Sequence, residues 1–163
     1  MDIGSGHGYP ADALSNFAPH PFVFRGLPVA SMEGLLQGLK FENPELQRHV
    51  LTLVGRAAKF KGKPKKWWRT QTLYWQGEPL DRHGEAYQQL LDEAFGALFT
   101  QNAKARAALL ATQEAVLQHS IGKSNVRETV LTRAEFTSRL TRLRAEFQRG
   151  AAQEPRGLSP ATT

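Results

Sequence analysis

Apolar residues recur at helical spacing over much of the second half of the chain. Between residues 86 and 99 they fall on one side of a helix, at Tyr87, Leu90, Leu91, Ala94, Phe95 and Leu98. A shorter helix is expected over residues 103–112. Closer to the C-terminus, Thr132 and Glu135 form a capping box ahead of apolar residues in a 4-3-4 spacing, at Phe136, Leu140, Leu143 and Phe147. The pattern therefore predicts three helices in this half.

The first half alternates between short strands and short helices. Apolar runs on either side of Arg25-Gly26 predict a β-hairpin with a tight turn over residues 22–30. A helix is expected over residues 32–42, with Ser31 as its N-cap. Asn43-Pro44 then ends this helix and begins the next, because Asn caps well and Pro suits a first helical turn.

Three stretches lack such periodicity. Residues 55–72 contain many basic residues together with Gly62 and Pro64, and are expected to be mostly loop, and residues 74–79 to be a turn. The tail over residues 150–163 is expected to be disordered, because it is rich in Ala, Gln, Pro, Gly, Ser and Thr. We therefore predict a mainly helical α+β fold, a single compact domain over residues 1–149 with a small number of short strands.

Composition excludes several classes of protein. With no cysteine among 163 residues, the chain has neither disulfides nor thiolate chemistry. No apolar run approaches the roughly 20 residues that span a bilayer, and the N-terminal residues do not resemble a secretory signal. A cytoplasmic location without membrane association is the expectation. The net charge of +6 favours polyanionic partners.

Three polar residues share one face of the helix expected after Ser31. Glu33, Gln37 and Lys40 stand at positions i, i+4 and i+7, and most of the remaining surface of that helix is apolar. At the edge of a core, desolvation would raise the pKa of Glu33 and lower the pKa of Lys40 toward values useful in catalysis. The alternative is a solvated stripe whose glutamate complements the positive end of the helix.

A cluster of basic residues with interspersed aromatic residues follows. It comprises Arg56, Lys59, Lys61, Lys63, Lys65, Lys66 and Arg69, together with Phe60, Trp67 and Trp68. Basic groups bind phosphates and indoles stack on bases, so the cluster favours contact with a nucleotide or a nucleic acid. The alternative is a solvated charge run beside one core tryptophan.

Three polar segments stand out; the amides and hydroxyls of the first two are of the kind that orient sugars and phosphates, and the third is a Gly-containing loop without the spacing of a phosphate-binding P-loop. They are Ser15-Asn16-Phe17, Gln101-Asn102 and residues 119–125, which begin at His119. Asn102 is also well placed to cap the following helix. No pair of histidines has helical ligand spacing, so no metal site is expected. The absence of a Gly-x-Ser-x-Gly motif and of cysteine disfavours acyl transfer.

The order of these motifs resembles the NADAR (YbiA-like) domain family over about residues 12–145. The resemblance lies in Leu14-Ser15-Asn16-Phe17, Pro21-Phe22, and Glu33 followed by Gln37 and Lys40-Phe41. Further matches are Gly55-Arg56, Trp68, the Phe95–Asn102 stretch and Leu109-Leu110-Ala111-Thr112. Each motif is short, but their order and spacing are together fairly specific.

One departure from the family bears on the substrate. Many members of the riboflavin pathway have an Asp and a Trp-Gly pair after the Leu-Leu-x-Thr helix, where this chain has residues 119–124, from His119 to Ser124. The chain is more similar to the branch associated with DarT-type toxins, which removes ADP-ribose from guanine in DNA. The resemblance thus implies an antitoxin-like N-glycosidase that reverses ADP-ribosylation and needs no cofactor.

The resemblance also implies roles for individual residues. Glu33 and Lys40 are the expected catalytic residues, and Lys40 could protonate the leaving group, hold a phosphate or form a Schiff base. The expected substrate-binding residues are Ser15, Asn16, Phe17, Gln37, Arg56, Trp68, Gln101, Asn102 and His119. The expected partners are an ADP-ribose-containing nucleotide and DNA, which would be single-stranded or flipped so that its base reaches the pocket.

Three other functions fit the same residues. One is an N-glycosidase acting on a ribosylated intermediate of riboflavin metabolism. Another is a non-catalytic module that binds ADP-ribose or nucleic acid. The third is DNA binding through residues 59–66 alone, which predicts salt-sensitive affinity.

Overall fold

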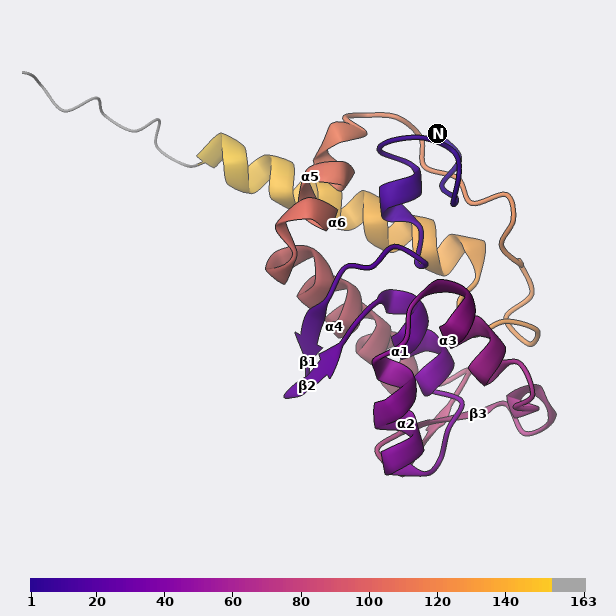
Figure 1. The fold of residues 1–163 in the computed structure, drawn as a ribbon. Helices are drawn as coiled ribbons and strands as arrows, with labels where there is room; N and C mark the ends of the chain where they lie inside the picture. The colour runs from indigo at the N-terminus through magenta and orange to yellow at the C-terminus, as the bar shows by residue number, and fades with distance from the viewer. Residues whose placement is uncertain (154–163) are drawn as a thin grey trace, which may run out of the picture.

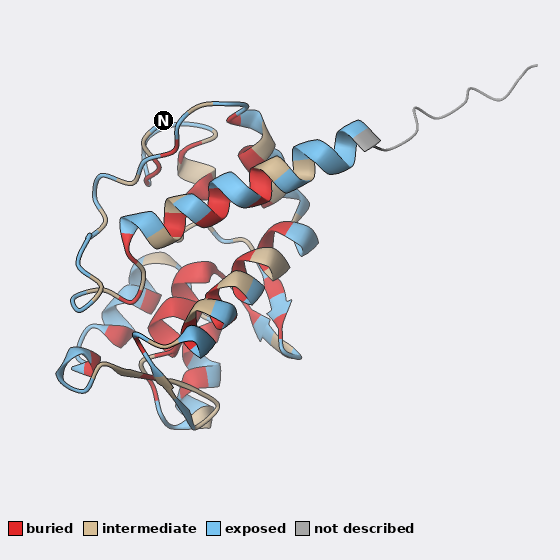
Figure 2. Ribbon diagram, turned by 180° about the vertical axis from the view of Figure 1, so that it is seen from behind, coloured by how far each residue is buried: buried red, intermediate tan, exposed pale blue. Residues whose placement is uncertain are grey.

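The computed structural model describes residues 1–153, which form an α+β fold as predicted. Figure 1 shows α1 near the centre of the molecule, where it contacts α2 and α3. In the view from behind, α4 and α6 turn exposed faces outward and buried faces toward the interior (Figure 2). The helices are α1 (Met32–Gly38), α2 (Pro44–Leu51), α3 (Gly55–Gly62), α4 (Glu85–Gln101), α5 (Ala103–Ala111) and α6 (Arg133–Gln153), and two 3-10 turns are η1 (Asp12–Leu14) and η2 (Trp67–Arg69).

Two antiparallel hairpins supply the strands. The predicted hairpin is present as β1 (Phe22–Phe24) and β2 (Leu27–Val29). Both turn residues, Arg25 and Gly26, have positive φ angles, of 49° and 81°. A two-residue turn needs such angles to match the right-handed twist of its flanking strands. A second hairpin, β3 (Thr72–Trp75) and β4 (Glu78–Asp81), occupies the region where only a turn was expected.

Helix α1 begins as predicted but ends earlier. The Ser31 hydroxyl accepts a hydrogen bond from Gly34 N at 3.0 Å and donates one to Leu53 O at 3.0 Å. The helix ends at Gly38 rather than near residue 42, and Lys40 lies in the turn that follows. The apolar pattern extends beyond the helix because this turn is itself part of the core, with Leu39 and Phe41 buried.

The expectation of a loop over residues 55–72 was wrong. The chain forms α3, η2 and the beginning of β3 there. Only Ala58 and Gly62 of α3 are buried, so the helix packs through small residues and exposes its lysines. A Cβ atom at Gly62 would overlap the side chain of Gln37 on α1, which shows how closely the two helices approach.

Predicted caps fix the beginnings of the later helices. Thr132 and Glu135 form the reciprocal capping box of α6, with hydrogen bonds of 3.1 and 2.8 Å. Helix α6 continues through Gln153 and thus includes the first four residues of the predicted tail, whereas residues 154–163 lie outside the described part of the chain. Within residues 1–153 no helix has the length and apolar character required to cross a membrane.

Candidate functional site

A cavity of about 500 Å³ lies where α1, the beginning of the chain and two later segments meet. Helix α1 and the turn after it contribute Glu33, Leu36, Gln37 and Lys40, and the N-terminal loops contribute Ser5, His7, Ser15, Asn16 and Phe17. The remaining lining residues are Lys59, Trp67, His119, Ile121, Gly122, Lys123, Glu128, Thr129, Val130 and Leu131. This volume is in the range of cavities that bind small molecules and nucleotides.

Helix α1 has two faces with different tasks. Gly34 and Gly38 face the α2 side, where a Cβ at Gly34 would lie 2.6 Å from Leu53 O. Glu33 and Gln37 line the cavity, and Gln37 Nε2 donates a hydrogen bond to Glu33 Oε1 at 2.8 Å. The close approach on the glycine face therefore fixes the helix from which the polar residues project.

Glu33 is a nearly buried carboxyl group, with 9% of its surface exposed. Burial raises its pKa, because the charged form loses solvation; the hydrogen bond from Gln37 and the positive charge of Lys40 oppose this shift. Within residues 1–153 no cation lies close enough to form an ion pair with Glu33. A partly desolvated carboxylate without a counter-ion is well suited to stabilise a positive charge that develops in a substrate.

Three lysines line the same cavity as this carboxyl group. Lys40 follows α1, Lys59 lies on α3 and Lys123 lies in the segment before α6. Burial lowers the pKa of Lys40, the charge of Glu33 opposes the shift, and Lys123 and Lys59 lower the pKa further. The cavity thus combines one buried acid with several basic groups, which suits a substrate that carries phosphates.

His119 is held in one orientation at the cavity. Its Nδ1 lies 2.9 Å from the backbone oxygen of Ile3, and its ring meets the ring of Phe136 edge-on at 5.0 Å. A carbonyl oxygen only accepts, so Nδ1 carries a proton in this hydrogen bond, and Nε2 is the ring nitrogen that does not contact Ile3. A Cβ at Gly122 would lie 2.5 Å from the His119 ring, so this position has no space for a side chain.

The loop with the Ser-Asn-Phe sequence lies directly against α1. The backbone oxygen of Asn16 accepts a hydrogen bond from Glu33 N at 3.0 Å, and the Ser15 hydroxyl accepts one from Phe17 N at 3.2 Å. Ser15 Oγ also lies 3.2 Å from Ser5 Oγ, which joins two N-terminal loops at the cavity. These three predicted residues therefore share the cavity with Glu33.

Comparison with known proteins gives the family. Residues 8–145 match the family described as bacteriophage protein GP30.3. The chain belongs to the bacteriophage GP30.3 family. It is 40% identical to an uncharacterized 17.1 kDa protein from the Gp30-rIII intergenic region of Enterobacteria phage T4, over 148 residues that cover 88% of this chain and 96% of the relative.

The fold of this GP30.3-family chain is similar to that of Escherichia coli YbiA, determined by NMR. The TM-score is 0.65 at 20% sequence identity, and the match covers 98% of this chain and 90% of YbiA. The predicted YbiA-like domain is therefore confirmed as a fold.

Some residues expected at the substrate lie elsewhere in this GP30.3-family chain. Arg56 and Trp68 are exposed and do not line the cavity. The indole ring that lines the cavity belongs to the neighbouring Trp67. Gln101 bonds to both the backbone N and O of Val23, at 2.7 and 2.9 Å. Asn102 caps α5 by accepting from Ala105 N at 3.0 Å and donates to Pro21 O at 3.2 Å. The pair thus fixes β1 and the beginning of α5.

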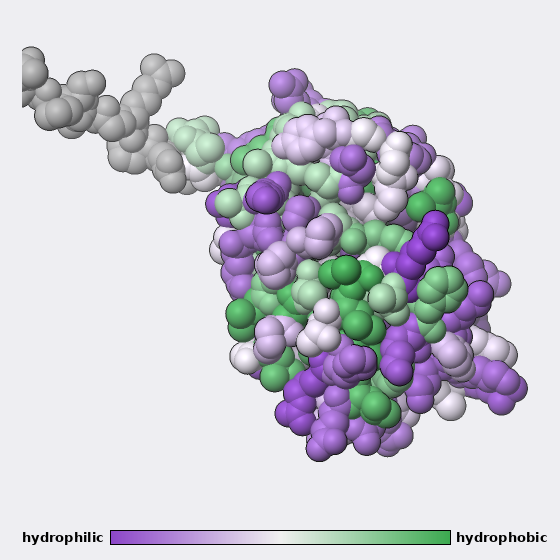
Figure 3. All heavy atoms as spheres, viewed as in Figure 1, coloured by the Kyte–Doolittle hydropathy of each residue, from purple (hydrophilic) through white to green (hydrophobic). Residues whose placement is uncertain are grey.

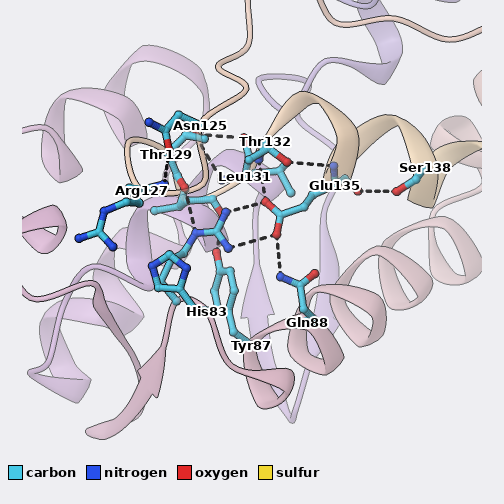
Figure 4. Close-up of polar contacts among 12 residues, drawn as sticks. His83, Tyr87, Gln88, Asn125, Arg127, Thr129, Leu131, Thr132, Glu135 and Ser138 are labelled. Carbon is cyan, nitrogen blue, oxygen red and sulfur yellow. Dashed lines mark hydrogen bonds and ion pairs between the residues drawn. The ribbon is translucent and has the colours of Figure 1, made fainter.

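A buried arginine that no sequence motif indicated supports one wall of the cavity. Arg82 has no exposed surface, and it forms two hydrogen bonds with the Glu135 carboxylate at 2.6 and 3.1 Å. It also donates to Thr129 O at 2.9 Å, and Tyr87 donates to the backbone oxygen of Val130. These contacts connect the segment before α6 to α4 and to the turn before it, so they fix the positions of Thr129 and Val130. Figure 4 shows Thr129, Tyr87 and Glu135 in this network.

The N-terminal residues also contribute in a way that the sequence did not indicate. Ile3 N donates to Gln118 O at 2.8 Å, and the Asp2 carboxylate accepts from Ser120 N at 2.9 Å. This pairing places His119 and the following residues beside Ser5 and His7.

Within residues 1–153 there is no group of three or more His, Cys, Asp or Glu side chains arranged for a metal ion.

Proposed function

We propose that this protein is an N-glycosidase that removes ADP-ribose from guanine bases, in DNA or in nucleotides, by hydrolysis. The observation that carries the proposal is Glu33, a nearly buried carboxyl group without a counter-ion, in a cavity that three lysines also line. The motifs shared with NADAR domains and the YbiA-like fold support the same reaction class.

Glu33 acts on the sugar. Cleavage of an N-glycosidic bond builds positive charge at the anomeric carbon, and a carboxylate beside that carbon stabilises the charge or positions the attacking water. Gln37 holds the carboxylate through its hydrogen bond to Oε1, and Asn16 holds the backbone of Glu33. Both contacts fix the acid before substrate enters.

The lysines act on the pyrophosphate and on the leaving base. Lys59 and Lys123 supply fixed positive charge for the phosphate oxygens. Lys40 donates a proton to the leaving nitrogen, because its lowered pKa makes the ammonium group a stronger acid than an exposed lysine. His119 and Trp67 contact the base, through the fixed Nε2 and through stacking.

The decisive experiment is hydrolysis of an oligonucleotide that carries ADP-ribose on guanine, with released ADP-ribose measured by chromatography and mass spectrometry. We expect turnover by the wild type and a loss of about 10²–10⁴-fold in Glu33→Gln, the range typical for removal of one acid–base group. Glu42→Gln is the matched control, because Glu42 is an exposed glutamate nine residues further along the chain. Equal activity of Glu33→Gln and the control would exclude Glu33 from the reaction.

Two substitutions of Lys40 separate its functions. Lys40→Ala removes both charge and proton, whereas Lys40→Arg keeps the charge on a group that does not release its proton at neutral pH. We expect both variants to be inactive if Lys40 transfers a proton; recovery in Lys40→Arg would instead assign it to the pyrophosphate. Reduction with cyanoborohydride during turnover would trap an adduct on Lys40 if it formed a Schiff base.

The same assay discriminates the alternatives. Turnover of a ribosylated pyrimidine intermediate of riboflavin metabolism, without turnover of ADP-ribosylated guanine, would assign the other glycosidase activity. Tight ADP-ribose binding by calorimetry with no hydrolysis of either substrate would indicate a binding module.

A further inference from the structure

The positive charge of this chain is concentrated in one segment. Between Glu45 and Glu78 the sequence has no Asp or Glu, and it contains eight basic residues: Arg48, Arg56, Lys59, Lys61, Lys63, Lys65, Lys66 and Arg69. The whole chain carries a net charge of +6, so the rest of the chain has a small excess of acidic residues. The basic character therefore belongs to one part of the molecule.

The part of this segment from Arg56 to Arg69 is exposed on α3, on η2 and on the turn between them. We call it the α3–η2 surface, and it comprises Arg56, Lys59, Lys61, Lys63, Lys65, Lys66, Trp68 and Arg69. All eight residues are exposed, and within residues 1–153 none of their cations takes part in an ion pair. Figure 3 shows hydrophilic side chains on the side of the molecule where α3 lies. The unpaired charges are therefore available to an external polyanion.

The α3–η2 surface begins at the cavity. Lys59 lines the cavity from α3, and Trp67 lines it from η2 with only 7% of its surface exposed. The next residue, Trp68, is 51% exposed, and the Arg69 guanidinium lies 5.6 Å from its ring centre. The indole of Trp67 thus faces the cavity, and the indole of Trp68 faces the outer surface.

We propose that the α3–η2 surface binds an unpaired polynucleotide strand, with one nucleotide in the cavity and a flanking base stacked on Trp68. Lysines bind the phosphates of any nucleic acid, but stacking on an exposed indole requires a base that is not paired. A nucleotide enters a cavity of this kind only after leaving a duplex, which also favours a single strand. The position of the nucleotide rests on the proposed function, whereas binding to the surface does not depend on hydrolysis.

The first test measures binding of unmodified fluorescein-labelled oligothymidine by anisotropy. The test variant carries Lys63→Glu and Lys66→Glu, and the matched control carries Lys104→Glu and Arg149→Glu. All four of these positions are exposed. Both variants change the net charge equally, so a difference between them reports on position. We expect the test variant to lose at least tenfold in affinity and the salt dependence to weaken, by a slope of about 0.7 for each lost phosphate contact.

Further arms identify the ligand. Trp68→Ala should weaken binding about tenfold, within the range for loss of one stacked base. A duplex of the same length should bind more weakly than the single strand, and oligouridine shows whether RNA or DNA is preferred. Equal affinity of the two double variants, tighter binding of the duplex, or preferential binding to anionic vesicles would overturn the proposal.

The second test separates this proposal from the proposed function. The Lys63→Glu, Lys66→Glu variant should lose about tenfold in kcat/KM on a modified oligonucleotide but retain activity on ADP-ribosylated guanosine, which has no flanking strand. An equal loss of kcat/KM on both substrates would overturn the proposal that the α3–η2 surface binds the flanking strand. Absence of hydrolysis of either substrate by the wild type, with strand binding intact, would refute the glycosidase and leave the surface assignment standing.

Discussion

Replacement of Gly62 by alanine tests whether the close contact between α3 and α1 holds the Glu33 carboxylate in place. A Cβ at this position would overlap Gln37 Oε1 and lie 2.8 Å from its Cδ and 3.0 Å from its Cβ. The overlap involves the base of the side chain as well as its end, so rotation of the amide alone does not relieve it. The amide must move, and it then loses its 2.8 Å hydrogen bond to Glu33.

The magnitude follows from three contributions. Overpacking of this kind costs about 1–3 kcal/mol, and loss of a hydrogen bond to a charged group costs about 1.5–3 kcal/mol before solvent replaces it. Alanine regains up to about 1 kcal/mol through its higher helix propensity. We expect a net loss of about 2 kcal/mol, which lowers the Tm of a domain of this size by about 4–8 °C.

Gly96→Ala is the matched control. Gly96 lies in the middle of α4, and a Cβ there would have no neighbour within 4 Å. The same chemical change should therefore raise stability by about 0.5–1 kcal/mol. Urea denaturation of both variants and of the wild type gives the two differences directly. Equal stability of Gly62→Ala and Gly96→Ala would refute the packing argument.

The same variant has a functional consequence. The hydrogen bond from Gln37 opposes the rise in the pKa of Glu33 that burial causes. Without this bond the pKa rises further, so the acid limb of kcat/KM should move to higher pH in Gly62→Ala and stay unchanged in Gly96→Ala. An unaltered pH profile in a destabilised Gly62→Ala would show that the contact matters for folding alone.

Three further predictions concern the supports of the site and its pH dependence. Arg82→Met should lower the free energy of unfolding by about 3–5 kcal/mol in urea denaturation, since it leaves the partly buried carboxylate of Glu135 without its cation. Adding Glu135→Leu should restore only part of this loss, because it also removes the capping-box hydrogen bond from Thr132 N. Asn102→Ala should cost about 1 kcal/mol through loss of a helix cap and leave kcat/KM unchanged; a large fall in kcat/KM would return this residue to the substrate site. The pH profile of kcat/KM should be bell-shaped, with an acid limb above 4.5 from Glu33 and a basic limb below 10.5 from Lys40, and limbs at these ordinary values would argue against burial of the two groups.

The Arg82–Glu135 pair makes a contribution to stability that changes with pH in a definite direction. The hydrogen bonds from Arg82 and Gln88 outweigh the effect of burial and lower the pKa of Glu135 below 4.5. A carboxyl group with a lowered pKa stabilises the fold above its unfolded value, and this contribution disappears as the pH falls through the folded value. The wild type should therefore lose stability below about pH 4.5, and Arg82→Met should lose less over the same range, as urea titrations at several pH values would show.

Hydrophobic spacing predicted those helices that bury large side chains. Helix α4 and helix α6 lie where the periodicity placed them, and the caps at Asn43 and Thr132 form the expected hydrogen bonds. Helix α3 was not predicted, because its buried residues are Ala58 and Gly62, which produce no apolar stripe. Packing through small residues depends on the partner helix and leaves almost no trace in the hydropathy of the segment itself.

The spacing of Glu33, Gln37 and Lys40 predicted that they would share a surface, and they line one cavity although Lys40 lies beyond the end of the helix. Periodicity does not distinguish Trp67 from Trp68. They are neighbours in a 3-10 turn, and which indole faces inward depends on how the turn packs. Family resemblance favoured Trp68, whereas the structure places Trp67 at the cavity.

The long connection between α5 and α6 explains why the remaining parts of the site were beyond prediction. The sequence predicted His119 and the segment that it begins, but residues 128–131, which also line the cavity, gave no such signal. The carbonyl groups of this connection have few strand partners to satisfy them. Arginines satisfy them instead, because a guanidinium group offers five donors. These contacts are Arg82 to Thr129 O, Arg133 to Ser120 O and Gly122 O, and Arg144 to Ala115 O.

Arg82 lies in the turn between β4 and α4, and Arg133 and Arg144 belong to α6, so residues that do not themselves line the cavity position this wall. A stretch of irregular chain fixed in this way can keep the His119 ring and the Lys123 ammonium in register with Glu33 across the cavity. The sequence of the connection does not predict this arrangement, because the arginines that order the connection lie outside it. The periodic pattern of α6 likewise marks its arginines as surface residues, although Arg139 and Arg144 are buried. Residues that hold the site are therefore found from the hydrogen bonds of the folded chain, and substitutions at Arg82 should disturb activity as well as stability.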